Sequence, residues 1–133
     1  MKTIPILLII LLTCNFFPFY SGQSPQVNQE ITAAIRSGDA VKLSVYFFDD
    51  AIDLSLPSLE GTYSKAQAIL LLKDFYTKNP PSSFVVDHEG SSDNGSLYII
   101  GSYKSTSASF RVYILIKKLS GNYLIQQLQF DTD

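Results

Sequence analysis

The sequence predicts an α+β domain in which three N-terminal helices pack on a bent antiparallel sheet. Apolar residues recur at helical spacing in three segments before residue 80, whereas the segments after it alternate apolar and polar residues as strands do. Tight-turn signals separate those later segments. A run of helices followed by a run of strands is typical of a helical layer that covers one face of a sheet.

The first 22 residues have the layout of a secretory signal peptide. One basic residue, Lys2, precedes an apolar run over residues 4–12, and the small residues Ser21 and Gly22 follow it. We therefore expect cleavage after Gly22, which leaves residues 23–133 as a single domain, long enough to form its own core. The expected location is the periplasm or the cell envelope, or the medium after secretion.

Two other fates of this N-terminal segment stay open. Residues 4–20 approach the ~17–25 apolar residues that span a bilayer, so the segment could remain as an uncleaved anchor. Cys14 allows lipid attachment, although bacterial lipoprotein signals prefer a small residue at the position of Thr13. If the signal is cleaved, we expect no membrane span in the remaining chain.

The composition argues against several kinds of site. The chain has one cysteine and one histidine, and the usual zinc and iron sites need several such ligands, so we expect no metal site and no cofactor. The formal net charge is −2 and there is no basic run, so binding of nucleic acid has little electrostatic support.

The first two helices are expected over residues 27–35 and 40–48. The apolar positions of the first are Val27, Ile31, Ala34 and Ile35. Gly38 can adopt the left-handed conformation that ends a helix. Asp39 can cap the second helix, because its carboxylate accepts hydrogen bonds from free backbone N–H groups.

A short strand and the third helix come next. Residues 52–56 alternate apolar and polar side chains, and Pro57 stops this strand. The segment "EGTYSKAQA" is expected to open the helix, because Ser64 and Gln67 have the spacing of a capping box. The helix should end at "NPP", residues 79–81, because a residue before proline is disfavoured in the helical region.

The rest of the chain predicts four longer strands. They are expected at residues 84–89, 97–103, 110–117 and 123–130. Asn94-Gly95 suits the tight turn between the first two. In the last strand the apolar residues change parity. A bulge at Gln126-Gln127 would return Tyr123, Ile125, Leu128 and Phe130 to one face and bend the sheet.

The alternation also predicts which face each side chain occupies, because successive strand residues point to opposite sides. Phe110, Val112, Ile114 and Ile116 share an apolar face that we expect to contact the helices. In the strand over residues 84–89, the acidic residues Asp87 and Glu89 are expected to face outward. This assignment puts His88 on the helix-facing side, near the rim.

Five segments carry a resemblance to known proteins: "GDA", "EGTYSKAQA", "NPPSSFVVDHEG", "IGSY" and "FRVYILIKK", which together span roughly residues 25–131. Through them the chain resembles an uncharacterised family of short exported Bacteroidota proteins, described only as a domain of unknown function. Three helices wrapped by a bent sheet are similar to the cone-shaped, cystatin-like roll of the nuclear-transport-factor-two-like fold. The resemblance implies an exported protein with this fold and supplies no activity.

An interior pocket is one candidate site. The known steroid isomerases and dehydratases of this fold class work in such a pocket, the former with an interior carboxylate base. We expect no interior carboxylate here, so no catalytic residue is assigned and a non-enzymatic protein is favoured. The alternative is a small apolar ligand contacted by Tyr63, His88 and Tyr103, or, less favoured, an enzyme using that pocket. His88 itself fits an ordinary strand-end histidine better than a catalytic one.

Binding through the outer sheet face or the mouth of the cone is the favoured function. Alternation places six candidate interface residues on the outer face: Val85, Tyr98, Ile100, Arg111, Tyr113 and Leu115. Exposed apolar patches rimmed by charge often mark interfaces, where tyrosine and arginine are enriched. Proteins of this fold commonly dimerise sheet to sheet, so a homodimer or an envelope protein is the expected partner. The competing interpretation is that a long loop or a chain terminus covers this face.

Overall fold

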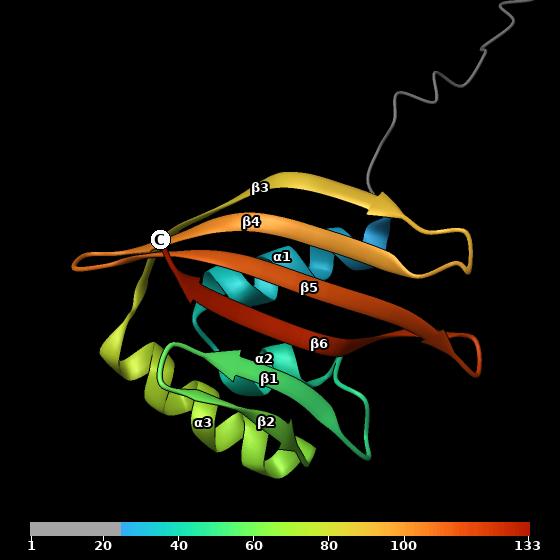
Figure 1. The fold of residues 1–133 in the computed structure, drawn as a ribbon, viewed down its shortest axis with the longest axis horizontal. Coiled ribbons are helices and arrows are strands. Elements are labelled where there is room, and N and C mark those ends of the chain that lie inside the picture. The colour runs from blue at the N-terminus through green and yellow to red at the C-terminus, as the bar shows by residue number, and fades with distance from the viewer. Residues whose placement is uncertain (1–24) are drawn as a thin grey trace, which may run out of the picture.

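The computed structural model describes residues 25–133, which form three helices and a six-stranded sheet (Figure 1). The predicted signal peptide, residues 1–22, and the possible lipidation site Cys14 lie outside the described residues. Within residues 25–133, no helix is both long and apolar enough to cross a membrane.

The helices are α1 (Gln26–Ser37), α2 (Ala40–Ser44) and α3 (Lys65–Lys78). The predicted end of α1 is confirmed, because Gly38 has the left-handed φ of 68°. Asp39 caps α2 by accepting a hydrogen bond from the backbone N–H of Lys42 at 3.1 Å. The capping box of α3 is also confirmed, with Ser64 and Gln67 bonding each other's backbone N–H groups at 3.2 Å.

The second helix is shorter than the range 40–48 that the sequence suggests. After Ser44 the chain turns and pairs with the last strand: the backbone N–H of Ile125 donates to the carbonyl of Tyr46 at 2.6 Å, and that of Phe48 donates to the carbonyl of Ile125 at 3.2 Å. Backbone groups engaged in this parallel bridge are not available for helical bonds, so tertiary pairing ends the helix early.

The strands are β1 (Ile52–Leu56), β2 (Leu59–Tyr63), β3 (Pro81–Ser91), β4 (Leu97–Ser105), β5 (Ser109–Leu119) and β6 (Asn122–Thr132). Their order across the sheet is β2-β1-β6-β5-β4-β3, with β1 parallel to β6 and all other neighbours antiparallel. The four predicted long strands are confirmed. Strand β2 is absent from the sequence-based prediction, which assigned the segment "EGTYSKAQA" to the start of the third helix.

Three register shifts interrupt the long strands: one at the start of β3, between Pro81 and Ser83, and two that decide which way candidate side chains face. Leu115 lies opposite Gln127 and Ile116 lies opposite Ile125, so Gln126 is an extra residue and the predicted bulge is confirmed. A second bulge, absent from the sequence-based prediction, lies in β3: Val86 pairs with Gly101 and His88 with Ile100, which leaves Asp87 as the extra residue.

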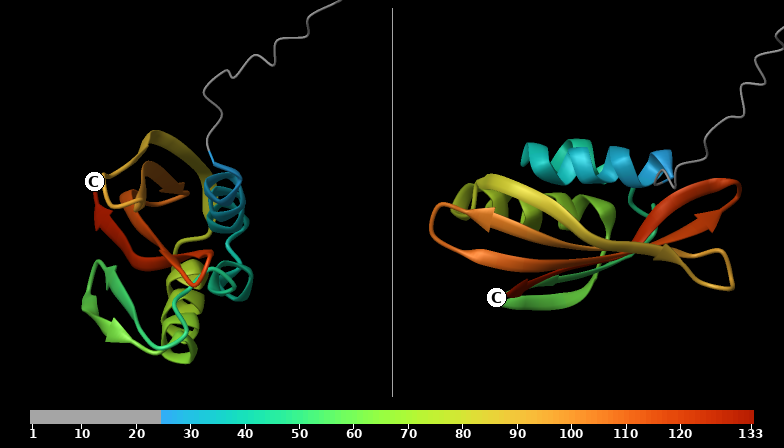
Figure 2. Two further views of the ribbon diagram at one scale, coloured as in Figure 1. Left: turned by 90° about the vertical axis from the view of Figure 1, so that its right-hand side faces the viewer. Right: turned by 90° about the horizontal axis from the view of Figure 1, so that it is seen from above.

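The core lies between the helices and the inner face of the sheet, as expected for this α+β arrangement (Figure 2). Four aromatic rings fill its centre: Phe75 of α3, Tyr103 of β4, Phe110 of β5 and Phe130 of β6. The ring centroids of Phe75 and Phe130 are 4.6 Å apart, and those of Tyr103 and Phe130 are 5.5 Å apart. All the buried apolar residues within residues 25–133 belong to this one cluster, so the described part of the chain has a single core.

Candidate functional site

The six candidate interface residues share one face of the sheet. The register places Tyr98 opposite Leu115, Ile100 opposite Tyr113, and Ser102 opposite both Arg111 and Val85. Cross-strand partners point to the same side, and the residues between them are buried against the helices. We call this side of β3–β6, which the helices do not contact, the outer face.

Nothing in the described part of the chain covers the outer face. The helices lie behind the sheet, and no loop or helix of residues 25–133 crosses the front of β3–β6 (Figures 1 and 2). The Val85 side chain is 56% exposed, while Tyr98, Ile100, Tyr113 and Leu115 are half-buried among one another. The competing interpretation of a covering loop therefore has no support within the described residues.

A hollow of about 360 Å³ lies at the centre of this face. It is lined by Ile100, Arg111, Tyr113, Gln129 and Asp131. Arg111 and Asp131 are cross-strand partners, and both are exposed, so a cation and an anion border an apolar floor. The Asp131 carboxylate accepts a hydrogen bond from the Gln129 amide at 2.7 Å.

Gln129 and Asp131 were not among the candidate residues. The signal was present in the sequence, because Gln127, Gln129 and Asp131 alternate with the apolar residues Leu128 and Phe130. Once the bulge at Gln126 is placed, this polar series must face outward beside Arg111.

A glycine opposite Tyr98 shapes the edge of the outer face. Gly90 pairs with Tyr98, and a Cβ atom at Gly90 would lie only 2.6 Å from the Tyr98 hydroxyl oxygen. The absence of a side chain therefore lets the Tyr98 ring lie across β3. This close approach extends the aromatic surface from β4 to the edge strand.

The prediction that His88 faces the helices is wrong. His88 is exposed and pairs with Ile100 on the outer face, because the extra residue Asp87 shifts the alternation by one position. Asp87 does face outward, accepting a hydrogen bond from the Ser102 hydroxyl at 2.6 Å. Glu89 was expected to face outward as well, but it faces the helices and accepts from the Asn28 amide at 3.3 Å.

His88 borders a polar groove at the sheet edge. The groove, about 450 Å³ in volume, lies between α1 and β3 and is lined by Gln29, Thr32, Arg36, Val86, Asp87, His88 and Glu89. Arg36 donates to the backbone carbonyl of Phe84 through Nη2 at 2.9 Å and Nε at 3.3 Å. The guanidinium is therefore already engaged by the protein itself.

The two candidate tyrosines lie elsewhere. Tyr103 is fully buried within the aromatic core, and its hydroxyl donates to the backbone carbonyl of Asn79 at 2.5 Å. Burial raises the pKa of Tyr103 well above its usual value, which keeps the phenol neutral. Tyr63 is half-buried at the end of β2, the opposite edge strand from β3. The structure therefore does not bring Tyr63, His88 and Tyr103 together as the lining of one interior pocket.

The described residues also hold all twelve acidic side chains of the sequence, and every one of them is exposed. The carboxylate base of the steroid isomerase pattern thus has no counterpart in the interior. Residues 25–133 contain no cluster of three or more His, Cys, Asp or Glu side chains that could hold a metal ion.

Comparison with solved structures finds close relatives in Bacteroides. A protein from Bacteroides uniformis is 26% identical, with a TM-score of 0.75 over 80% of this chain and 97% of that one. A protein from Bacteroides ovatus is 32% identical, with a TM-score of 0.73 over 78% and 93%. Both are described as DUF4783 family proteins.

A more distant likeness shows the fold alone. An NTF-2-like protein of unknown function from Silicibacter pomeroyi is 11% identical, with a TM-score of 0.58 over 81% of this chain and 91% of that one. No curated protein matches the sequence. The family described as "Domain of unknown function (DUF4783)" matches residues 28–131. The chain therefore belongs to the DUF4783 family, and its fold is nuclear-transport-factor-two-like.

Proposed function

We propose that this protein is an exported, non-enzymatic interaction module that binds a protein partner through the outer face. The observation that carries the proposal is the uncovered hollow lined by Ile100, Arg111, Tyr113, Gln129 and Asp131. Its floor is aromatic and aliphatic, and its border carries one cation and one anion. Tyrosine and arginine at the centre of a patch are typical of protein interfaces.

The partner that fits best is a second copy of this chain. Arg111 and Asp131 are cross-strand neighbours, yet they form no ion pair with each other or with any other described residue. A face that presents both charges side by side is complementary to itself after a twofold rotation. In such a dimer Arg111 of one copy faces Asp131 of the other, and the exposed Val85 supplies apolar contact.

The substitution Tyr113→Asp tests this interface, because it places a carboxylate on the apolar floor. We expect the wild-type domain from residue 23 to be a dimer in native mass spectrometry, and the variant to be a folded monomer. Leu70→Asp is the matched control: it adds the same charge at an exposed apolar position on α3 and should leave the dimer intact. A dimer that survives Tyr113→Asp contradicts the proposal, as does a monomeric wild type that captures no envelope protein.

Export is a separate part of the proposal, and it rests on the layout of residues 1–22. The intact mass of the protein purified from its own cells distinguishes the three possible fates. Cleavage after Gly22 gives the mass of residues 23–133. Lipidation gives a chain that starts at Cys14 with an added diacylglyceryl mass, and a retained anchor gives the full sequence. We expect the first mass, in the envelope fraction or the medium.

A further inference from the structure

The turn between β3 and β4 contains the one asparagine–glycine pair of the sequence, Asn94-Gly95. Both residues are exposed, and Gly95 has the positive φ of 83° that this turn requires. A Cβ atom added at Gly95 would meet nothing beyond its chain neighbours within 4 Å, so the described chain does not crowd the peptide bond between the two residues. The pair belongs neither to the core nor to the hollow of the outer face.

An asparagine that precedes a glycine can lose its side-chain amide without an enzyme. The backbone nitrogen of the glycine gives up its proton and bonds to the side-chain carbonyl carbon of the asparagine, the carbon–nitrogen bond of the amide breaks, and ammonia leaves. Water then opens the resulting cyclic imide. Opening at the side-chain carbonyl leaves aspartate, and opening at the main-chain carbonyl leaves isoaspartate. The reaction consumes only water, and glycine favours it because it has no side chain to hinder the attack.

Two other asparagines of the described chain lack either an exposed side chain or an unhindered neighbour. Asn28 is 1% exposed in α1, and its amide donates to the Glu89 carboxylate at 3.3 Å. Asn122 is exposed at the start of β6, but Tyr123 follows it, and a bulky side chain hinders attack by the backbone nitrogen of its own residue. Neither asparagine therefore combines access to water with an unhindered nucleophile.

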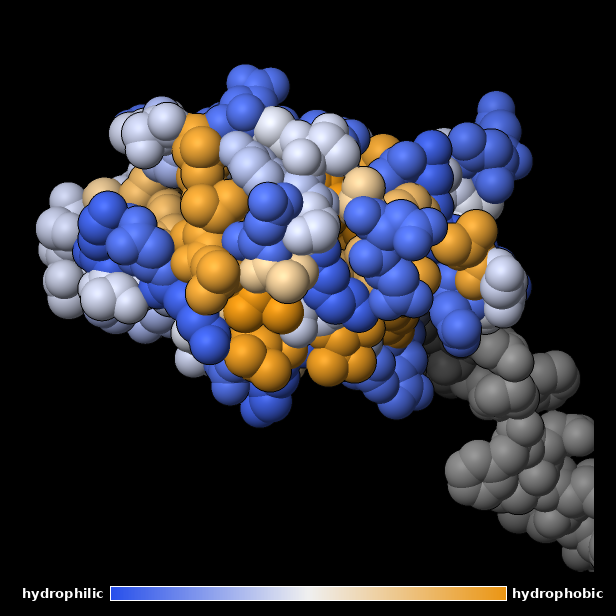
Figure 3. All heavy atoms as spheres, turned by 90° about the horizontal axis from the view of Figure 1, so that it is seen from below, coloured by the Kyte–Doolittle hydropathy of each residue, from blue (hydrophilic) through white to orange (hydrophobic). Residues whose placement is uncertain are grey.

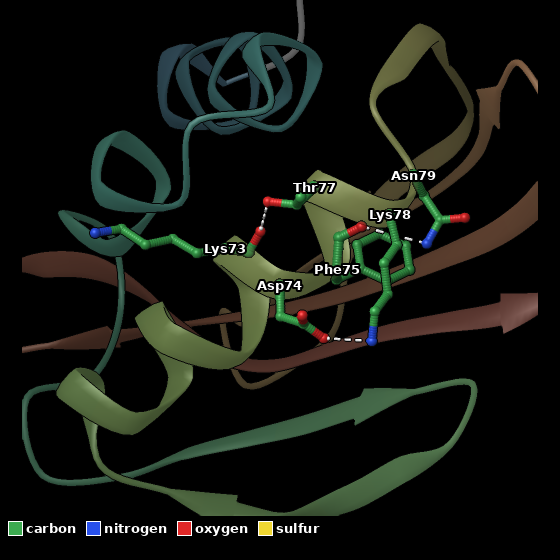
Figure 4. A network of polar contacts seen from close by, with 6 residues as sticks. All are labelled: Lys73, Asp74, Phe75, Thr77, Lys78 and Asn79. Atoms are coloured by element: carbon green, nitrogen blue, oxygen red, sulfur yellow. Dashed lines mark hydrogen bonds and ion pairs between the residues drawn. The ribbon is translucent and has the colours of Figure 1, made fainter.

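Asn79 lacks the nucleophile altogether. It ends α3, on the side of the molecule seen in Figure 3, where hydrophilic areas lie between apolar ones. Its Nδ2 atom donates to the Phe75 carbonyl at 3.2 Å (Figure 4). Pro80 follows, and a proline nitrogen carries no hydrogen in a peptide bond, so it cannot form the imide by the same step. Among the described asparagines, Asn94 alone has both an exposed side chain and an unhindered nucleophile.

Three hydrogen bonds restrain this pair in the folded turn. The Ser92 hydroxyl donates to Oδ1 of Asn94 at 2.5 Å, and the backbone N–H of Ser96 donates to the same oxygen at 3.0 Å. The backbone N–H of Gly95 donates to the Ser92 carbonyl at 3.0 Å. Ring closure needs a free Gly95 nitrogen and an Asn94 side chain that can turn towards it, so all three bonds oppose it. The reaction therefore requires local opening of the turn.

We propose that Asn94 is a site of spontaneous deamidation and that the Ser92 hydroxyl restrains the reaction in the folded domain. The product replaces a neutral amide by a carboxylate beside Asp93, and isoaspartate also adds a methylene group to the main chain of the turn. The pairing of β3 with β4 starts next to this turn, with Ser91 opposite Leu97, so a longer turn loosens the end of the hairpin. The inference does not rest on the proposed dimer.

Peptide mapping by mass spectrometry tests the inference on residues 23–133 during incubation in mildly alkaline buffer. We expect an aspartyl and an isoaspartyl product at Asn94, separated by chromatography, and no comparable change at Asn28, Asn79 or Asn122. Ser92→Ala should deamidate about threefold faster or more in the folded domain, because one restraining hydrogen bond is lost.

The matched control is Ser82→Ala. It removes a hydroxyl at the other end of β3, where Ser82 donates to the Lys104 carbonyl at 2.9 Å, and should leave the rate at Asn94 unchanged. In a synthetic peptide of residues 89–99, where no fold holds the turn, Ser92→Ala should change the rate little.

Three outcomes would overturn the proposal. The first is an Asn94 that stays intact in the wild type and in Ser92→Ala while the peptide deamidates. The second is a rate in folded Ser92→Ala that is equal to or slower than that of the wild type, because the hydroxyl then does not restrain the reaction. The third is equal acceleration by Ser82→Ala, which would show general loosening of the hairpin.

Discussion

The hydroxyl group of Tyr103 in β4 donates a hydrogen bond to the backbone carbonyl of Asn79, the residue that ends α3, with an oxygen–oxygen distance of 2.5 Å. The bond ties the C-terminal end of the helix to β4, the neighbour of the edge strand β3. Carbonyls at a helix end have no partner within the helix, so the phenol satisfies one of them inside the core. Tyr103 is therefore a structural residue of the fold.

Replacement of Tyr103 by phenylalanine should destabilise the domain by roughly 1–2 kcal/mol, because the Asn79 carbonyl loses its donor while the ring packing stays. The free energy of unfolding in urea measures this change. The oligomeric state of the folded variant should equal that of the wild type, since Tyr103 lies on the inner face. A variant as stable as the wild type would show that water replaces the phenol without cost.

The domain should lose stability at alkaline pH. Burial raises the pKa of both Tyr76 and Tyr103 above the usual value of about 10, so the folded state retains protons that the unfolded state releases. Stability is complete below about pH 10 and falls as the pH rises beyond it. Urea midpoints between about pH 8 and 11 should show this decline, with a smaller slope in Tyr103→Phe. If stability falls with pH equally steeply in the variant and the wild type, Tyr103 does not contribute to the alkaline loss of stability.

Gly101 is needed for packing in the middle of β4. A Cβ atom at this position would lie 2.7 Å from the Phe84 ring and 2.7 Å from the backbone oxygen of Val85. Gly101→Ala should therefore destabilise the domain by roughly 1–3 kcal/mol, as overpacked cores do. Gly61→Ala is the control, since its nearest neighbour is the Tyr63 hydroxyl at 3.1 Å, the far end of a side chain that can shift. Thermal unfolding should rank the two variants in that order.

The buried amide of Asn28 makes a pH-dependent prediction. Its side chain is 1% exposed, its Nδ2 atom donates to Glu89, and its Oδ1 atom has no partner among the described residues. Asn28→Asp places a second carboxylate beside Glu89 and should destabilise the domain by roughly 3 kcal/mol at neutral pH.

The loss of stability caused by Asn28→Asp should become smaller as the pH falls towards about 4. Burial beside Glu89 raises the pKa of the new carboxyl group in the folded state, and its protonation restores a hydrogen-bond donor to Glu89. Asn28→Leu is the neutral control, and the loss of stability that it causes should change much less over the same pH range. Urea midpoints at a series of pH values compare the two. If the stability difference between Asn28→Asp and the wild type stays constant with pH, repulsion between the two carboxylates is not its cause.

The bulges at Gln126 and Asp87 show what the sequence reveals about the sheet and what it hides. Apolar residues change parity around Gln126, so the displaced alternation predicts that bulge. In β3 the apolar series stops at Val86, and only polar residues follow Asp87. No apolar side chain there indicates that the alternation has shifted by one residue. The predicted orientations of His88 and Glu89 were therefore wrong.

Long-range pairing explains the other differences in the fold. The backbone around Phe47 bonds to β6, a contact nearly 80 residues away in the sequence, and this ends α2 early. Strand β2 forms because it pairs with β1, which leaves Leu59–Tyr63 outside the helix that Ser64 caps. Local sequence patterns predicted the helix caps and the long strands correctly. The end of α2 and strand β2 depend on pairing with distant segments, which local patterns do not identify.

Both edges of the sheet resist further strand addition. At one edge, the Arg36 guanidinium occupies the Phe84 carbonyl, and the bulge at Asp87 interrupts the regular spacing of backbone groups. At the other, β2 is only five residues long. Short or irregular edge strands are common protections against aggregation. Neither edge therefore offers a long regular strand for another molecule to pair with, so the fold disfavours fibril growth even at high protein concentration.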